Sequence, residues 1–142
     1  MSLFLPAFLL PPALEDIRTR EIRNLYWVLI VAARCVFLIL KRDREGLVSS
    51  LLGTLVAALI FALAFLISRD GIGPGDVKLM IAVAFYLGLE LFLRALFFIS
   101  LISALFSLIL LAVKQATKKT ALPFAPFIFA GTCVATLFEV VK

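Results

Sequence analysis

Residues 47–68 read LVSSLLGTLVAALIFALAFLIS and contain no charged side chain. A helix needs about 20 consecutive apolar residues to cross the hydrocarbon core of a bilayer, and this stretch supplies them. The rest of the 142-residue chain has the same character, because 64% of all residues are hydrophobic and only 16% are charged. Ordinary globular domains are about 45–50% apolar and about 25% charged. The sequence therefore predicts a chain that is embedded in a membrane.

Other apolar runs flank this stretch on both sides. They cover residues 2–14, 25–40, 77–92, 95–113 and 121–141. We expect an all-α, polytopic membrane helix bundle with about six transmembrane helices, the first of them short, which forms one membrane-embedded domain over residues 1–142. Gly53 and Ala57 are small residues four positions apart, and this spacing predicts a close helix–helix contact.

The polar connections alternate between two sides if every run crosses the membrane. Residues 15–24, 69–76 and 114–120 then share one side, while 41–46 and a short link near 93–94 share the other with the C-terminus. The first side carries the larger share of the Lys and Arg residues. Because basic residues concentrate in cytoplasmic loops, we expect the first side to face the cytoplasm.

The inventory of reactive side chains excludes several classes of function. The chain has no histidine, which excludes Ser–His and Cys–His catalysis and histidine metal sites within it. Cys35 and Cys133 are far apart in the sequence, which argues against a thiolate zinc site and a disulfide framework. We expect no metal and no cofactor. The net charge of +5 is spread between apolar runs, which favours membrane lipids over nucleic acid as partners.

Asp76 ends the segment GIGPGD at residues 71–76. Three glycines and a proline ahead of an apolar run predict bent backbone, which is tolerated at membrane depth only where protein buries it or where it lines a wet cavity. Glycine also lets another backbone, such as an extended peptide, come close. The alternative is that Asp76 is simply the N-cap of the following helix.

Asp16 follows the first apolar run. On its own it could be a solvated charge beside the membrane, paired with Arg20 four residues later. Two apolar runs separate Asp16 from Asp76, however, so the chain returns to the side that it left. Two carboxyl groups held close together cannot both ionise cheaply and share a proton. One can then act as general base on a water and the other as general acid.

Three segments resemble those of a known family. Residues 73–76 (GPGD) form a GxGD motif, residues 16–24 (DIRTREIRN) are similar to the pattern D-x-R-x-x-x-I-P-N, and residues 123–127 (PFAPF) are similar to P-F-x-P-F. Together, in this order, they resemble the type IV prepilin peptidases and preflagellin peptidases, which are membrane aspartic peptidases.

The resemblance implies roles for individual residues. Asp16 and Asp76 correspond to the catalytic pair, and Gly73 and Gly75 correspond to the glycines that shape the loop presenting the second aspartate. Lys78 matches the lysine that follows this aspartate in the family, and we interpret it as an electrostatic or headgroup contact or as a topological charge.

The resemblance also implies a substrate. Such enzymes remove the short basic leader from prepilins, pseudopilins or archaellins at the cytoplasmic face of the cell membrane. Phe124 and Phe127 either line the substrate groove or anchor the helix in lipid, and we expect the prolines beside them to loosen the start of the last helix. The substrate-binding candidates in this segment are Pro123, Phe124, Pro126 and Phe127.

The sequence departs from the family pattern in places. Arg23 stands where the family has proline, so the turn into the second helix differs. The N-terminal run is short for a transmembrane helix. The four-cysteine methyltransferase portion of many bacterial members has no counterpart here, so we expect peptidase activity without N-methylation.

Two other functions remain open from the residues alone. One is a small membrane transporter or assembly subunit without enzymatic activity, and the other is a GxGD peptidase that cuts other membrane peptides. Arg34 and Glu90 lie in apolar runs, where charge is a hint of function. We expect Glu90 to pair with Arg94 four residues later and Arg34 to reach a headgroup or an acid of a neighbouring helix.

Overall fold

The computed structural model describes residues 4–19, 23–67, 73–113 and 124–141, and the regular structure in these ranges is helical. The helices within these described ranges are α1 (Leu5–Thr19), α2 (Asn24–Lys41), α3 (Arg44–Ile67), α4 (Pro74–Leu87), α5 (Leu89–Ala112) and α6 (Ala125–Val141). The predicted all-α fold is confirmed.

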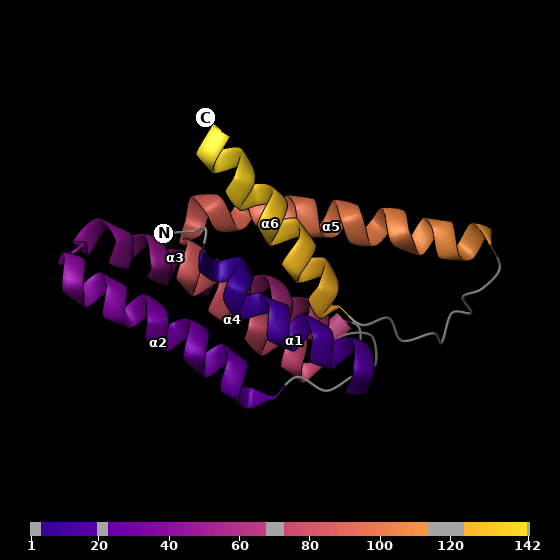
Figure 1. Ribbon diagram of the computed structural model, residues 1–142, viewed down its shortest axis with the longest axis horizontal. Coiled ribbons are helices and arrows are strands. Elements are labelled where there is room, and N and C mark those ends of the chain that lie inside the picture. Colours follow the sequence, from indigo (N-terminus) through magenta and orange to yellow (C-terminus); the bar gives the residue numbers. More distant parts are fainter. Residues whose placement is uncertain (1–3, 20–22, 68–72, 114–123, 142) are drawn as a thin grey trace.

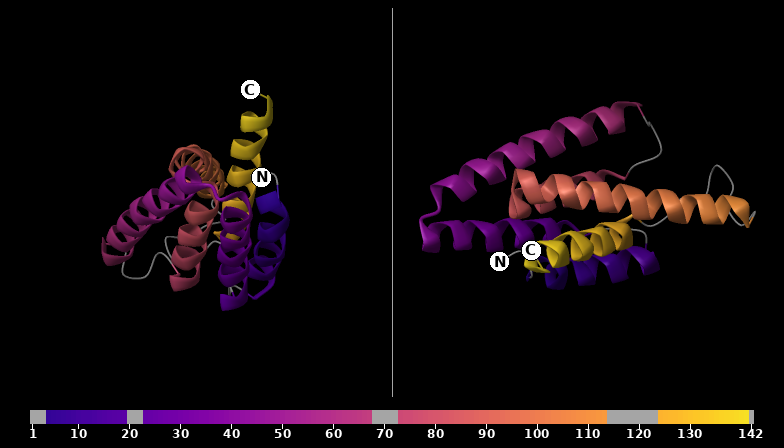
Figure 2. Two further views of the ribbon diagram at one scale, coloured as in Figure 1. Left: turned by 90° about the vertical axis from the view of Figure 1, so that its left-hand side faces the viewer. Right: turned by 90° about the horizontal axis from the view of Figure 1, so that it is seen from above.

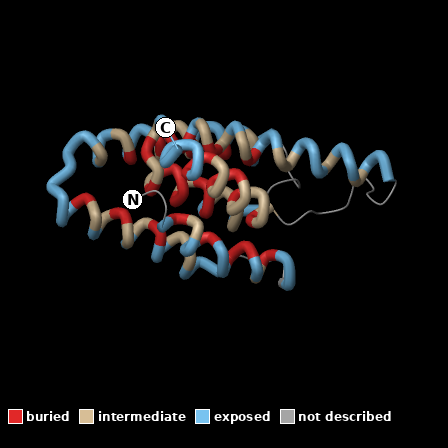
Figure 3. The backbone as a smooth tube through the Cα atoms, turned by 45° about the horizontal axis from the view of Figure 1, so that its top comes forward, coloured by how far each residue is buried: buried red, intermediate tan, exposed pale blue. Residues whose placement is uncertain are grey.

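Helix α4 occupies the centre of the bundle. It packs against α2, α3 and α5, while α6 lies on α5 and α1 (Figures 1 and 2). The C-terminal part of α5 projects beyond the other helices, and exposed residues predominate there and along α3 (Figure 3). In a bilayer those apolar faces meet lipid, which leaves the short central helix as the core.

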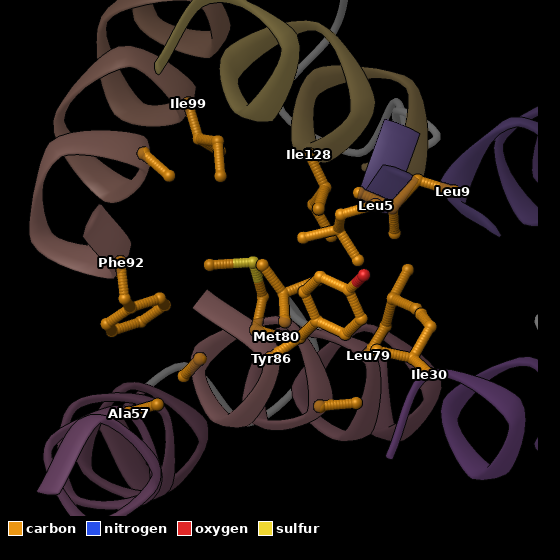
Figure 4. Packing of buried hydrophobic residues seen from close by; sticks show 14 of the residues in the cluster. Leu5, Leu9, Ile30, Ala57, Leu79, Met80, Tyr86, Phe92, Ile99 and Ile128 are labelled. Carbon is orange, nitrogen blue, oxygen red and sulfur yellow. The ribbon is translucent and has the colours of Figure 1, made fainter. Parts of the chain in front are cut away.

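The core joins all six helices through apolar side chains. The residues that meet around α4 include Leu5, Leu9, Ile30, Ala57, Leu79, Met80, Tyr86, Phe92, Ile99 and Ile128 (Figure 4). Each of them is nearly or fully buried. Burial of this kind fixes the helices against one another and so fixes the positions of the helix ends.

Within the described part of the chain, three helices are long and apolar enough to cross a membrane, namely α2 with 18 residues and α3 and α5 with 24 each. Helix α6 is apolar but has 17 residues. Helix α1 has 15 residues and contains Pro11 and Pro12, so at about 1.5 Å per residue it is shorter than the roughly 30 Å hydrocarbon core. The expectation of a short first helix is confirmed.

The boundary between α4 and α5 differs from the prediction. The run 77–92 is not one helix, and the link near 93–94 is wrong, because α4 ends at Leu87 and α5 begins at Leu89. Gly88 between them has φ 77°, a backbone conformation that residues other than glycine rarely adopt. The Leu89 N–H donates to Ser49 Oγ over 3.1 Å, which satisfies one free amide at the start of α5.

Two glycines allow close helix contacts. A Cβ on Gly53 would lie 2.9 Å from the Ala84 carbonyl oxygen, and one on Gly131 would lie 2.6 Å from Ile99 N. Because backbone atoms are among the close neighbours at both positions, neither can accept a side chain without movement of a helix. The close contact predicted at Gly53 is confirmed.

The intramembrane charges have local partners. Arg94 forms an ion pair with Glu90, as predicted. Arg34 of α2 is buried, and it donates to Ser50 Oγ over 3.0 Å and to the Gly46 carbonyl over 3.3 Å. Arg34 thus bonds to a hydroxyl and a carbonyl of α3, and the negative charge of Asp43, in the link between α2 and α3, also acts on it.

Candidate active site

The C-terminal end of α1 and the N-terminal ends of α2, α4 and α6 meet at one end of the bundle (Figure 1). Asp16 lies in the last turn of α1 and Asp76 in the first turn of α4. The two carboxyl groups are close enough for the charge of Asp16 to act on Asp76. The structure therefore brings the two aspartates to the same side, as the count of crossings predicted.

Asp16 is buried, with only 5% of its surface exposed. Its Oδ2 accepts a hydrogen bond of 3.0 Å from the backbone N–H of Ala125, the first residue of α6. The alternative of a solvated charge beside the membrane is wrong, because α1 continues past the apolar run to Thr19 and carries Asp16 beneath α6. A buried carboxylate needs such a donor, and the start of a helix has amides without intrahelical partners.

The sequence of α6 determines which amide reaches Asp16. The Phe124 carbonyl accepts the N–H groups of Phe127 and Ile128 over 3.0 and 3.2 Å. Pro126 has no N–H. The Ala125 amide is thus the group of the first turn that is left for Asp16. The prediction that Pro126 loosens the helix is wrong, since proline at the second helical position removes no intrahelical bond.

Asp76 occupies the third position of α4. Gly73 is the N-cap residue and Pro74 the first helical residue, and the Asp76 N–H donates to the Gly73 carbonyl over 3.1 Å. The alternative that Asp76 is the N-cap is therefore wrong. A Cβ on Gly73 would lie 3.3 Å from Asp76 Oδ2, so glycine leaves room for the carboxyl group. Gly75 is half-buried in the same turn.

The surroundings of Asp76 favour its neutral form. Burial, and after it the negative charge of Asp16, raise the pKa of Asp76 from 3.8 to about 6, although a backbone hydrogen bond with Gly73 opposes them. Asp76 Oδ1 is buried and has no hydrogen-bond partner among the described residues. One charged and one neutral carboxyl group is the state that general acid–base catalysis requires.

Lys78 lies on the surface of the bundle, in the first half of α4. It is exposed, and its Nζ donates to Asn24 Oδ1 over 3.3 Å. This bond connects the start of α4 to the start of α2. A second link joins α1 to α2, where Tyr26 hydrogen-bonds to Glu15, the residue before Asp16.

The two phenylalanines of the last segment are half-buried at the start of α6. The ring centroids of Phe124 and Phe127 are 6.5 Å apart, and the Phe127 ring lies 5.2 Å from that of Phe106 in α5. Packing on α5 accounts for the placement of Phe127, and a role of either ring in binding substrate stays a prediction. Pro123 lies outside the described residues.

Sequence reasoning missed two groups at this site. One is the Ala125 amide, whose only signal is the Ala-Pro pair, because proline removes the next donor. The other is Asn24, which belongs to the quoted motif segment but received no role. Within the ranges that the structure describes, no group of three or more His, Cys, Asp or Glu side chains is placed to hold a metal ion.

Comparison with known proteins identifies relatives of the chain. The model of the type IV leader peptidase family matches residues 3–113. A prepilin leader peptidase/N-methyltransferase of Bacillus subtilis is 37% identical over 90 residues, which cover 63% of this chain and 36% of the relative. A protein of the same name from Aeromonas salmonicida is 27% identical over 95 residues, covering 66% and 33% respectively. The chain thus spans about a third of the length of these relatives. No solved structure matches.

Proposed function

The chain belongs to the type IV leader peptidase family, and from this premise we propose that it is a membrane aspartic endopeptidase. Its substrates are prepilin-like precursors, from which it removes the short basic leader at the cytoplasmic face of the cell membrane. The observation that carries the proposal is the pairing of Asp16 with Asp76, in which the pKa of Asp76 is raised to about 6.

The pair performs peptide hydrolysis without any other reactive group. The charged carboxylate removes a proton from water, whose oxygen attacks the scissile carbonyl carbon, and the neutral carboxyl group donates its proton to the carbonyl oxygen. The resulting gem-diol collapses as the C–N bond breaks. The amine receives the proton taken from water, and the second carboxylate recovers a proton from a hydroxyl of the gem-diol. The products are a free carboxyl and a free amino end, and the pair returns to its starting state.

The location of the site suits a substrate that is itself a membrane helix. The side with more basic residues is the expected cytoplasmic side, and both aspartates lie at that end of the bundle. A precursor that diffuses in the bilayer presents the junction between its leader and its helix at the same level. Gly73 leaves space beside Asp76, which supports the approach of an extended backbone.

Co-expression with candidate prepilins tests the proposal. Asp16→Asn and Asp76→Asn change one oxygen of each carboxyl group to an amide nitrogen and conserve its volume. We expect both variants to accumulate in the membrane and to leave the leader attached. Glu139→Gln is the matched control, because Glu139 is an exposed acid near the other end of α6.

Three outcomes separate the alternatives. Leader removal by wild type and Glu139→Gln alone supports the proposal. Trimming by either aspartate variant removes that residue from the catalytic pair. If wild type trims no prepilin but cuts another membrane peptide in a manner that needs both aspartates, the substrate class is wrong and the catalytic pair is right.

A further inference from the structure

The two carboxyl groups have different surroundings. Asp16 Oδ2 accepts the Ala125 amide at the start of α6, where the helix end favours a negative charge. Asp76 Oδ1 is buried and has no donor in the part of the chain that the structure describes. A buried oxygen without a donor is costly, and more so when the group is charged. The negative charge of the pair therefore belongs on Asp16.

We propose that the backbone amide of Ala125 is a positioning group that holds Asp16 as the charged member of the pair, which makes Asp16 the general base and Asp76 the general acid. The inference rests on the proposed function and assigns the roles within it. In the hydrolysis described above, Asp16 takes the proton of the attacking water and later passes it to the amine. Asp76 protonates the carbonyl oxygen and recovers a proton when the gem-diol collapses.

Two features of α4 favour the charged form of Asp76 and so oppose this assignment of roles. Asp76 lies in the first turn, where the helix dipole favours a charge, and a backbone bond with Gly73 also stabilises it. The pKa of Asp76 is nonetheless raised, because its burial and the charge of Asp16 outweigh the Gly73 bond. The dipole alone is the weaker influence at a helix end, since a direct bond to a charged group contributes more.

Other charged groups leave this asymmetry in place. Among the described residues near the pair are Arg18, exposed in the last turn of α1, and Glu15, bonded to Tyr26 of α2. Arg23 acts on the same tyrosine, and Lys78 is bonded to Asn24. The other charged groups of α2, Arg34 and Lys41, lie in the second half of that helix. Among the described residues, the charged side chains of α3, α5 and α6 lie toward the opposite ends of those helices: Arg44, Glu45, Glu90, Arg94 and Glu139. The Ala125 amide is therefore the feature that can be removed selectively.

Ala125→Pro removes this one donor. Residue 125 is the first residue of α6, a position at which proline is favoured because its missing N–H has no intrahelical partner. Ala125→Gly keeps the N–H and removes the methyl group. Arg44→Pro places proline at the first residue of α3, at the end of the bundle away from the aspartates, and controls for proline itself.

The measurement is the pH profile of leader removal from a prepilin-like precursor by the full chain in lipid nanodiscs. A pair that works with one charged and one neutral carboxyl group gives a bell-shaped dependence of the rate on pH. The acid limb reports the first ionisation and the alkaline limb the second. If Asp16 ionises first, loss of its donor moves the acid limb of Ala125→Pro upward by about one pH unit or more, while the alkaline limb stays in place because Asp16 is already charged there.

Each other result overturns the inference in a recognisable way. An upward shift of the alkaline limb alone means that Asp76 ionises first and the roles are reversed. A lower maximum with both limbs unmoved means that Ala125 has only a structural role. Ala125→Gly should keep the wild-type limbs, and a shift there would assign the effect to the methyl group. Absence of cleavage by wild type contradicts the proposed function instead.

Discussion

Replacing Gly131 by alanine tests whether the packing of α6 on α5 determines the geometry of the carboxyl pair. A Cβ at this position would lie 2.6 Å from Ile99 N and 2.7 Å from Ile99 Cα. Both are backbone atoms of α5, which cannot rotate away as a side chain can. Moving the amide contact from 2.6 Å to an ordinary 3.4 Å separates the two helices locally by about 0.8 Å.

This displacement reaches the site through α6. Ala125 lies six residues before Gly131, about 9 Å along the helix axis, and its N–H bonds to Asp16 over 3.0 Å. A shift of about 0.8 Å is enough to carry this bond beyond the usual hydrogen-bond range. Overpacking costs about 1–3 kcal/mol of stability, and a misplacement of about 1 Å at a catalytic group lowers the rate by up to about 100-fold. We expect Gly131→Ala to unfold more readily and to remove leaders 10- to 100-fold more slowly.

The assay combines thermal unfolding in detergent with the rate of leader removal. Gly53→Ala is the matched control, because its Cβ meets backbone of Ala84 at the end of the bundle away from the aspartates. We expect that variant to lose stability while it keeps more of its rate. Wild-type stability and rate in Gly131→Ala would refute the close crossing of α5 and α6. A destabilised Gly131→Ala with an unchanged rate would show that α6 does not position Asp16.

Three further predictions concern single groups. Burial and a neighbouring charge raise the pKa of Asp76 from 3.8 to about 6, so the folded chain holds this proton more tightly than the unfolded chain. The stabilisation from this protonated carboxyl group is complete below about pH 4 and is lost as the pH rises through 6. Thermal unfolding should therefore show wild type becoming less stable relative to Asp76→Asn between these pH values. A constant difference between the two would contradict the raised pKa of Asp76. Lys78→Met and Asn24→Ala remove a bond between exposed groups, so a double-mutant cycle of unfolding free energies should give a coupling below about 1 kcal/mol but above zero, whereas strict additivity would mean that the bond does not form. Gly88→Ala forces alanine to φ 77° and places its Cβ 2.6 Å from Ser49 Oγ, so denaturant unfolding should show a loss of about 1–2 kcal/mol, and Ser49→Ala in the same chain should recover part of it; full stability of Gly88→Ala would refute the described junction.

Hydropathy alone predicts most of the helices of this fold, but it does not predict where one apolar run is divided into two helices. A run of apolar residues records contact with lipid or core and carries no information on where the chain changes direction. Gly88 and Leu89 are as apolar as their neighbours, so the run 77–92 reads as one helix although it contains the end of α4 and the start of α5. The signals that mark the junction are the glycine itself and Ser49, which lies 40 residues earlier and caps α5.

The juxtaposition of the aspartates follows from a simpler property of the sequence. Two apolar runs between Asp16 and Asp76 return the chain to one side, whatever the exact helix ends are. Their local surroundings do not follow in this way. The burial of Asp16 depends on α1 continuing through polar residues to Thr19, and its partner is a backbone amide, which every residue except proline carries. The Ala-Pro pair indicates that the Ala125 amide is free, but no pattern of side chains predicts that this amide reaches Asp16.

The dependence of Asp16 on α6 has a physical reason. Asp16 lies in the last turn of α1, where the dipole of its own helix disfavours a negative charge. The start of α6 brings the opposite end of another helix to the same carboxylate, whereas Asp76 lies at the favourable end of its own helix. The family match ends at residue 113, before α6 begins. Helix α6, which lies outside the matched segment, thus compensates the less favourable position of Asp16. The electrostatic balance of the pair depends on three helix ends, namely the end of α1 and the starts of α4 and α6.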